Sequence, residues 1–157
     1  MTETKRLTRG ADSEVTPAYS GDVRRLLDGG MVSAMIRQIA PQFFTTEMAA
    51  TLAYYKDTLG FDCVGTWDDP PVYAIVARDE HRIHFRFAEP PKQNPDKYAD
   101  ELLDAYLFIE DADALYAEYA ARGAEFTRAL GDMPWGSREF VVKDCDGRLL
   151  AFGATSE

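Results

Sequence analysis

From residue 36 onward, apolar and polar positions follow strand and helix periods in a fixed order. Residues 36–45 are predicted to form a strand, and residues 47–59 carry apolar side chains at helical spacing before a glycine stop at Gly60. Three further strand-like segments follow, separated by turn residues, at 61–67, 72–78 and 82–88. This part of the chain therefore predicts one βαβββ unit.

The same order returns after a proline-containing linker at residues 89–100. A strand is predicted at 104–110 and a helix at 111–122, which Gly123 ends. Three more strands are then predicted, at 124–128, 138–143 and 148–153. The sequence predicts a second βαβββ unit.

The two units keep nearly the same register. Glu47 and Asp111, at the two helix starts, are 64 positions apart, and Gly60 and Gly123 are 63 positions apart. An internal repeat of this kind indicates an α+β fold with two βαβββ repeats, at 36–88 and 104–153. Each sheet has one open face that must be covered by something.

Residues 1–34 lack this order. The segment is polar, mixed in charge and interrupted by glycine and proline, so it is predicted to be a mobile extension preceding a domain at 35–157. A start codon upstream of the true one, with Met31 or Met35 as the true start, and a packed N-terminal arm are the alternatives.

The segment 133–150 combines a turn, a strand, a second turn and a second strand. Its first turn, Pro134-Trp135-Gly136, is stiffened by proline and presents a tryptophan at a rim. Tryptophan contributes little to folding at such a place but stacks well on planar ligands. Trp135 is therefore the first candidate for ligand binding.

Several segments resemble the glyoxalase/bleomycin-resistance/extradiol-dioxygenase superfamily, also called vicinal oxygen chelate. Residues 47–61 resemble its helix signature, and residues 144–150 are similar to its closing Asp-Pro-Asp-Gly-Asn hairpin, with Cys145 and Arg148 as departures. Residues 113–119 and 134–140 look closest to the bleomycin-resistance proteins. The resemblance covers roughly residues 36–153.

This resemblance implies a curved sheet from each unit and a half-open cup. In the bleomycin-resistance subgroup two chains pair so that each cup combines units from both. A homodimer with a small-molecule ligand is therefore expected by analogy. The aromatic residue that lines the drug crevice of that subgroup corresponds to Trp135.

The family's metalloenzymes hold a metal with side chains on the first strand of each unit and on the last strand. These positions correspond here to Ala40, Asp104 and Ala151. A methyl group offers no lone pair, and Asp104 with His84 and Gln42 is a weak set for a divalent metal. No metal and no cofactor are expected, and metal-dependent oxygenase or glyoxalase chemistry becomes improbable.

Further candidates lie on the predicted strands. Alternation places Tyr106 and Phe108 on the face of Asp104, and only one of Phe43 and Phe44 can line the cup. Arg86 and Arg138 are candidates for orienting polar groups or pairing with Asp104. The predicted ligand-binding set is Trp135, Tyr106, Phe108, Asp104, His84, Trp67, Arg86 and Arg138.

Charge and composition limit the kinds of molecule that the protein is expected to bind. A net charge of −10 argues against nucleic acid and mildly favours a cationic or neutral ligand. No apolar segment approaches the length that spans a bilayer and no signal peptide is visible, so a cytoplasmic protein is expected. The two cysteines, Cys63 and Cys145, define no disulfide framework.

The sequence thus predicts a metal-independent binding protein, rather than an enzyme, that sequesters a planar and possibly cationic antibiotic. One alternative is a metal-independent enzyme with Asp104 or His84 as general base. Another is a structural or regulatory dimer whose cups are filled by side chains.

Overall fold

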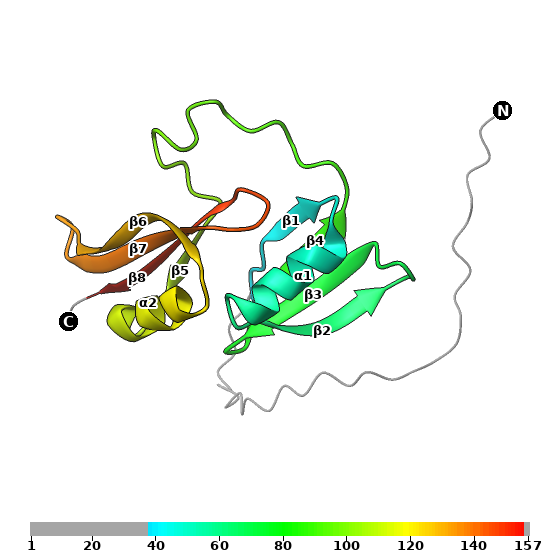
Figure 1. Ribbon diagram of the computed structural model, residues 1–157, viewed down its shortest axis with the longest axis horizontal. Helices are drawn as coiled ribbons and strands as arrows, with labels where there is room; N and C mark the ends of the chain where they lie inside the picture. The colour runs from blue at the N-terminus through cyan, green and yellow to red at the C-terminus, as the bar shows by residue number, and fades with distance from the viewer. Residues whose placement is uncertain (1–37, 156–157) are drawn as a thin grey trace, which may run out of the picture. The chain divides into compact units, whose positions relative to one another are not determined.

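The computed structural model describes residues 38–155, which form two four-stranded sheets with one helix each (Figure 1). The first unit comprises β1 (Gln42–Thr45), α1 (Met48–Asp57), β2 (Asp62–Trp67), β3 (Tyr73–Arg78) and β4 (His81–Phe87). The second comprises β5 (Ala105–Phe108), α2 (Ala112–Ala121), β6 (Glu125–Asp132), β7 (Ser137–Lys143) and β8 (Leu149–Thr155). The predicted α+β fold with two βαβββ units is confirmed.

The two sheets have the same topology. Their strand orders are β1-β4-β3-β2 and β5-β8-β7-β6, and in each sheet the first strand pairs parallel to the last while the other pairs are antiparallel. The predicted extension at 1–34, with Met31, and the candidate start Met35 lie outside the described residues. No helix of the described part is long and apolar enough to cross a membrane.

Local signals explain the ends of both helices and the start of α2, whereas α1 begins after Glu47 without a side-chain cap. Gly60 and Gly123 follow the helices with φ of 71° and 76°, in the left-handed region that glycine enters without strain. Asp111 begins α2 by accepting a hydrogen bond from the Ala114 backbone N–H at 2.9 Å. The two units therefore end their helices in the same way, with a glycine in the left-handed conformation.

Each helix covers one face of its own sheet, as Figure 1 shows for α1 and α2. On α1, Tyr55 is fully buried, and on α2 Tyr119 is buried with its ring 5.3 Å from that of Phe152. Phe140 stacks on Phe152 at 5.2 Å. We call the face away from the helix the open face of each sheet.

Several strands differ in length from the prediction; β5, for example, spans Ala105–Phe108 rather than residues 104–110. β1 begins at Gln42 rather than at residue 36, and β6 continues to Asp132, beyond the predicted end at residue 128. Glycine and aspartate at 131–132 are typical of turns, but Asp132 pairs with Arg138 across the hairpin, which extends the strand. The turn that carries Trp135 is shorter as a result.

A buried carboxylate links the hairpin between β7 and β8 to the first unit. Asp144 has a fully buried side chain and accepts hydrogen bonds from the Tyr55 hydroxyl at 2.8 Å and from Arg148 Nη1 at 2.6 Å. Asp146 accepts from the Thr51 hydroxyl at 2.9 Å. The closing hairpin of the second unit therefore bonds directly to α1.

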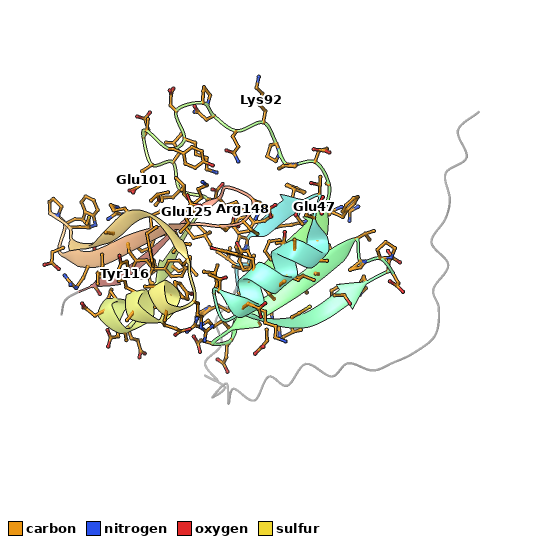
Figure 2. All side chains as sticks on the ribbon, in the orientation of Figure 1. Glu47, Lys92, Glu101, Tyr116, Glu125 and Arg148 are labelled. Carbon is orange, nitrogen blue, oxygen red and sulfur yellow. The ribbon has the colours of Figure 1, made fainter. Side chains whose placement is uncertain are left out.

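Arg148, a departure from the family hairpin, completes this link (Figure 2). Its Nη2 donates to the Phe44 backbone carbonyl of β1, and its guanidinium lies over the rings of Phe43 and Phe85 at 4.9 and 5.6 Å. Arginine at this position supplies donors to the hairpin and to β1 at once, which a shorter asparagine has too few N–H groups to do.

Candidate functional site

Glu139 on β7 is the centre of a buried hydrogen-bond network on the open face of the second sheet. Its side chain is only 2% exposed, yet its oxygens meet four donors. These are the Tyr106 hydroxyl at 2.7 Å, Trp135 Nε1 at 2.8 Å, the Ser137 hydroxyl, and Arg128 Nη2 at 3.1 Å. A buried carboxylate with this many donors is fully satisfied and fixed in place.

The same donors keep Glu139 ionised. Burial by itself would raise the pKa of the Glu139 carboxyl, but the hydrogen bonds from Ser137, Trp135, Tyr106 and Arg128 lower it to about 2. The pKa of the Tyr106 hydroxyl is raised, first by burial and then by its bond to Glu139. Tyr106 therefore remains a donor and Glu139 an acceptor at neutral pH.

Strand register places the aromatic candidates around this carboxylate. Phe108 on β5 and Glu139 on β7 both pair with Gly153 on β8, so the three share the open face. A Cβ at Gly153 would lie only 2.7 Å from Cζ of Tyr106. Glycine is required here because the Tyr106 ring crosses Gly153 to reach Glu139.

Trp135 lies in the β6–β7 turn, which is closed by the Met133 N–H donating to the Ser137 carbonyl at 2.7 Å. Its side chain stays largely free: Trp135 is 69% exposed and Phe108 is 80% exposed, with the Phe108 ring 4.9 Å from that of Tyr106. We call Tyr106, Phe108 and Trp135 the Trp135 platform. Glu139 bonds to Tyr106 and Trp135, and Phe108 packs against the Tyr106 ring. The platform offers exposed rings, two of which are fixed through their polar atoms.

The other candidates on the first sheet form a second group. Trp67, Tyr73, Arg86 and Phe44 pair in succession across β2, β3, β4 and β1 and share the open face. The Trp67 and Tyr73 rings meet edge to face at 5.5 Å, and the Tyr73 hydroxyl and His84 Nδ1 are 2.6 Å apart. We call Trp67, Tyr73, Arg86 and Phe44 the Arg86 row.

The register also decides between the two neighbouring phenylalanines. Phe43 is buried in the core, whereas Phe44 pairs with Arg86 and lies on the open face. Phe44 is thus the one that joins the exposed aromatic surface.

Asp104 does not pair with either predicted arginine. Its Oδ2 accepts from Lys97 Nζ and from the Leu149 backbone N–H at 2.8 Å. Lys97 comes from the linker, and both side chains line a pocket of about 440 Å³ that also includes Gln42 and Arg148. No residue of the Trp135 platform lines this pocket.

Arg138 is placed away from the open face, which corrects the expectation that it pairs with Asp104. It pairs instead with Asp113 of α2 at 2.8 Å and with Asp132 at 2.9 Å. Because side chains alternate along a strand, Arg138 points to the helix side while Glu139 points to the open face. A motif that contains both residues could not show which one faces the ligand surface.

The donor set does not suit a metal ion. Ala151 is fully buried in the same sheet, between Tyr106 and Val141, and offers no ligand atom, while Asp104 already holds the Lys97 ammonium. Within residues 38–155, His, Cys, Asp and Glu nowhere gather in a group of three that could hold a metal ion. We therefore derive no chemistry through a metal.

Sequence reasoning missed Glu139 and Arg128, and it noted Tyr73 as a strand aromatic without including it in the ligand-binding set. Glu139 belongs to the quoted motif, but nothing local shows that donors from β5, β6 and the turn converge on it. A four-residue spacing from Trp135 to Glu139 across a short hairpin turn was the available signal. For Arg128 and Tyr73 the sequence offered no signal beyond strand alternation.

A family model described as the Glyoxalase/Bleomycin resistance protein/Dioxygenase superfamily matches residues 36–152. The chain belongs to this superfamily. The match extends over both βαβββ units and confirms the resemblance seen in the helix and hairpin motifs. No curated protein matches the chain.

Solved structures share the fold, and the match covers the whole length of each of the following three. A bleomycin-binding protein from bleomycin-producing Streptomyces verticillus, complexed with copper(II)-bleomycin, is 25% identical with a TM-score of 0.61, covering 80% of this chain and 100% of that one. A glyoxalase-related enzyme from Clostridium phytofermentans is 23% identical with a TM-score of 0.64, covering 80% and 100%. The antibiotic binding protein TnmS3 from a Streptomyces species is 20% identical with a TM-score of 0.59, covering 81% and 100%.

Proposed function

We propose that this chain is a binding protein that sequesters a planar aromatic small molecule of the antibiotic type on its Trp135 platform. The observation that carries the proposal is the Glu139 network. It fixes Trp135 and Tyr106 through their polar atoms, while Trp135 and Phe108 remain 69% and 80% exposed. Rings held in place before binding stack on a ligand at low entropic cost.

The bleomycin-binding relative supports the ligand class. That protein is 25% identical, covers 80% of this chain and is complexed with copper(II)-bleomycin. An aromatic platform without a metal donor set is suited to affinity rather than to turnover.

The alternative of base catalysis has less support. Asp104 is engaged by the Lys97 ammonium and the Leu149 N–H, and His84 Nδ1 is engaged by the Tyr73 hydroxyl. Neither group lies in the Glu139 network, so neither of the two proposed bases belongs to the platform. Binding without reaction is the function that this arrangement favours.

Titration with bleomycin, after treatment of the protein with a chelator, tests the proposal. We expect saturable quenching of tryptophan fluorescence at one ligand per chain. Trp135→Ala should weaken binding about tenfold or more, because loss of a stacked ring removes on the order of 1.4 kcal/mol. Tyr98→Ala, which removes a linker aromatic that is 47% exposed, is the matched control and should leave affinity unchanged.

Equal affinity of the Trp135→Ala and parent proteins would contradict a role for the platform. Conversion of bound ligand to a product, followed by mass spectrometry, would contradict sequestration and favour an enzyme.

The proposal includes pairing of two chains, in which each of two cups combines units from both copies and holds one ligand, so that the pair binds one ligand per chain. Rings as exposed as Phe108 and Trp135 are unusual on a surface without a partner. Sedimentation equilibrium at micromolar concentration should give twice the 17.6 kDa of one chain. A single-chain mass across the same concentration range would contradict this pairing.

A further inference from the structure

Arg86 is an exposed cation in the middle of an aromatic row on the first sheet. Across the register, Arg86 pairs with Tyr73 on one side and with Phe44 on the other, and Trp67 follows beyond Tyr73. Directly paired residues on one sheet face have Cβ atoms about 4.5–5.5 Å apart. Arg86 therefore stands between two aromatic residues in this row, with Trp67 beyond Tyr73.

Most arginines of the described residues are already paired with carboxylates. Arg78 pairs with Glu118, Arg128 with Glu139, Arg138 with Asp113, and Arg148 with Asp144. In contrast, Arg86 has no ion pair within residues 38–155. An unpaired arginine is unexpected in a chain with ten more acidic than basic residues.

Toward the middle of the first sheet, the row next to Arg86 carries no carboxylate on this face, while at the other end the exposed Asp68 and Asp69 follow Trp67 in the β2–β3 turn. The next row along the sheet consists of Gly65, Ile75, His84 and Gln42. The nearest acidic residue of these strands on the open face is Asp62, which pairs with Ala77 in the row of Arg82. That row is four residues further along β4, about 13 Å at strand spacing.

The Trp135 platform, in contrast, has no free carboxylate to attract a cation. Both Glu139 oxygens already accept hydrogen bonds, one of them from Arg128. Asp104 and Asp132 are paired with Lys97 and Arg138. These carboxylates are therefore neutralised by cations, whereas Arg86 keeps a positive charge without an ion pair beside aromatic residues.

We propose that the Arg86 row binds the acid group of a planar aromatic ligand, with the guanidinium on the acid and the rings of Tyr73, Phe44 and Trp67 against the planar part. A guanidinium pairs with a carboxylate through two parallel hydrogen bonds and stacks on aromatic faces. This inference rests on the proposed function, in which each cup combines units from both copies, so that one ligand meets the Arg86 row as well as the Trp135 platform. It adds the charge of the ligand: anionic, rather than the cationic charge suggested by composition.

Three anthracene derivatives that differ only in charge test the inference. Anthracene carboxylate, the neutral anthracenemethanol and the cationic anthracenemethylammonium are titrated by calorimetry into the full chain. We expect the carboxylate to bind at least tenfold more tightly than the neutral compound, and the ammonium more weakly still. Arg86→Gln should remove the preference for the carboxylate and leave the affinity for anthracenemethanol within about twofold.

Arg82→Gln is the matched control, because Arg82 lies on the same strand and face four residues away. It should keep at least a fivefold preference for the carboxylate. Equal binding of all three probes, or an unchanged preference in Arg86→Gln, would overturn the inference while leaving aromatic sequestration intact. Failure of all three probes to bind would also overturn the inference, and the bleomycin titration decides the proposed function separately.

Discussion

Replacement of Arg148 with methionine should lower the free energy of unfolding by about 3–5 kcal/mol. The side chains of Arg148 and Asp144 are 8% and 0% exposed, and their atoms lie 2.6 Å apart. Methionine fills a similar volume over the rings of Phe43 and Phe85 but leaves the Asp144 charge buried without its cation. Removal of one partner of a buried pair is costly for this reason.

Urea unfolding followed by circular dichroism measures this loss. Arg138→Met is the matched control, because Arg138 also pairs with two carboxylates, but its side chain is 38% exposed and those of its partners 65% and 81%. Exposed pairs contribute at most about 1 kcal/mol. Similar losses of unfolding free energy in both variants would show that burial of the Asp144–Arg148 pair does not increase its contribution to stability.

Replacement of Glu139 with glutamine should weaken ligand binding about tenfold or more without unfolding the chain. Glutamine keeps the shape but is neutral and has one acceptor oxygen. If this oxygen replaces Oε1, which accepts from Trp135, Tyr106 and Ser137, these bonds lose their charge assistance and the amide NH2 meets the Arg128 guanidinium in place of Oε2. The indole then loses its fixed orientation, which fluorescence anisotropy of Trp135 in a Trp67→Phe background would detect. Affinity is measured by the bleomycin titration.

Glu101→Gln is the matched control for Glu139→Gln. Glu101 also accepts from Arg128, at 2.9 Å, but it contacts neither Trp135 nor Tyr106. Its replacement should leave both anisotropy and affinity nearly unchanged. An equal loss of affinity in the two variants would mean that Arg128, rather than the anchoring of the rings, controls binding.

Acidification should lower the unfolding free energy of the parent protein more than that of the Glu139→Gln variant. The pKa of Glu139 is lowered from 4.5 to about 2, so its ionised form stabilises the fold fully above pH 4.5, and this contribution disappears as the pH falls toward 2. A shift of this size corresponds to roughly 3 kcal/mol, since one pKa unit is about 1.4 kcal/mol. Unfolding free energies of the two proteins should therefore differ most above pH 4.5 and converge near pH 2. A constant difference across this range would contradict the assignment.

The sequence alone determined the repeat, the ends of both helices and the start of α2. The glycines at 60 and 123 and the aspartate at 111 act within one turn of chain, so local conformational preference was sufficient to place them. Strand alternation likewise predicted that Tyr106 and Phe108 share a face, because that depends on a period of two residues and on nothing distant.

Only the tertiary structure decided which charges meet. Arg138 and Glu139 are adjacent in sequence, yet one pairs with α2 and the other collects donors from β5, β6 and a turn. Asp104 meets a linker lysine rather than a strand arginine, and Arg148 bonds to a strand more than a hundred positions away. Ion pairs depend on distance in space, and the sequence fixes that distance only through the packing of the whole domain. The charge of the surfaces available to a ligand is therefore a property of the folded protein.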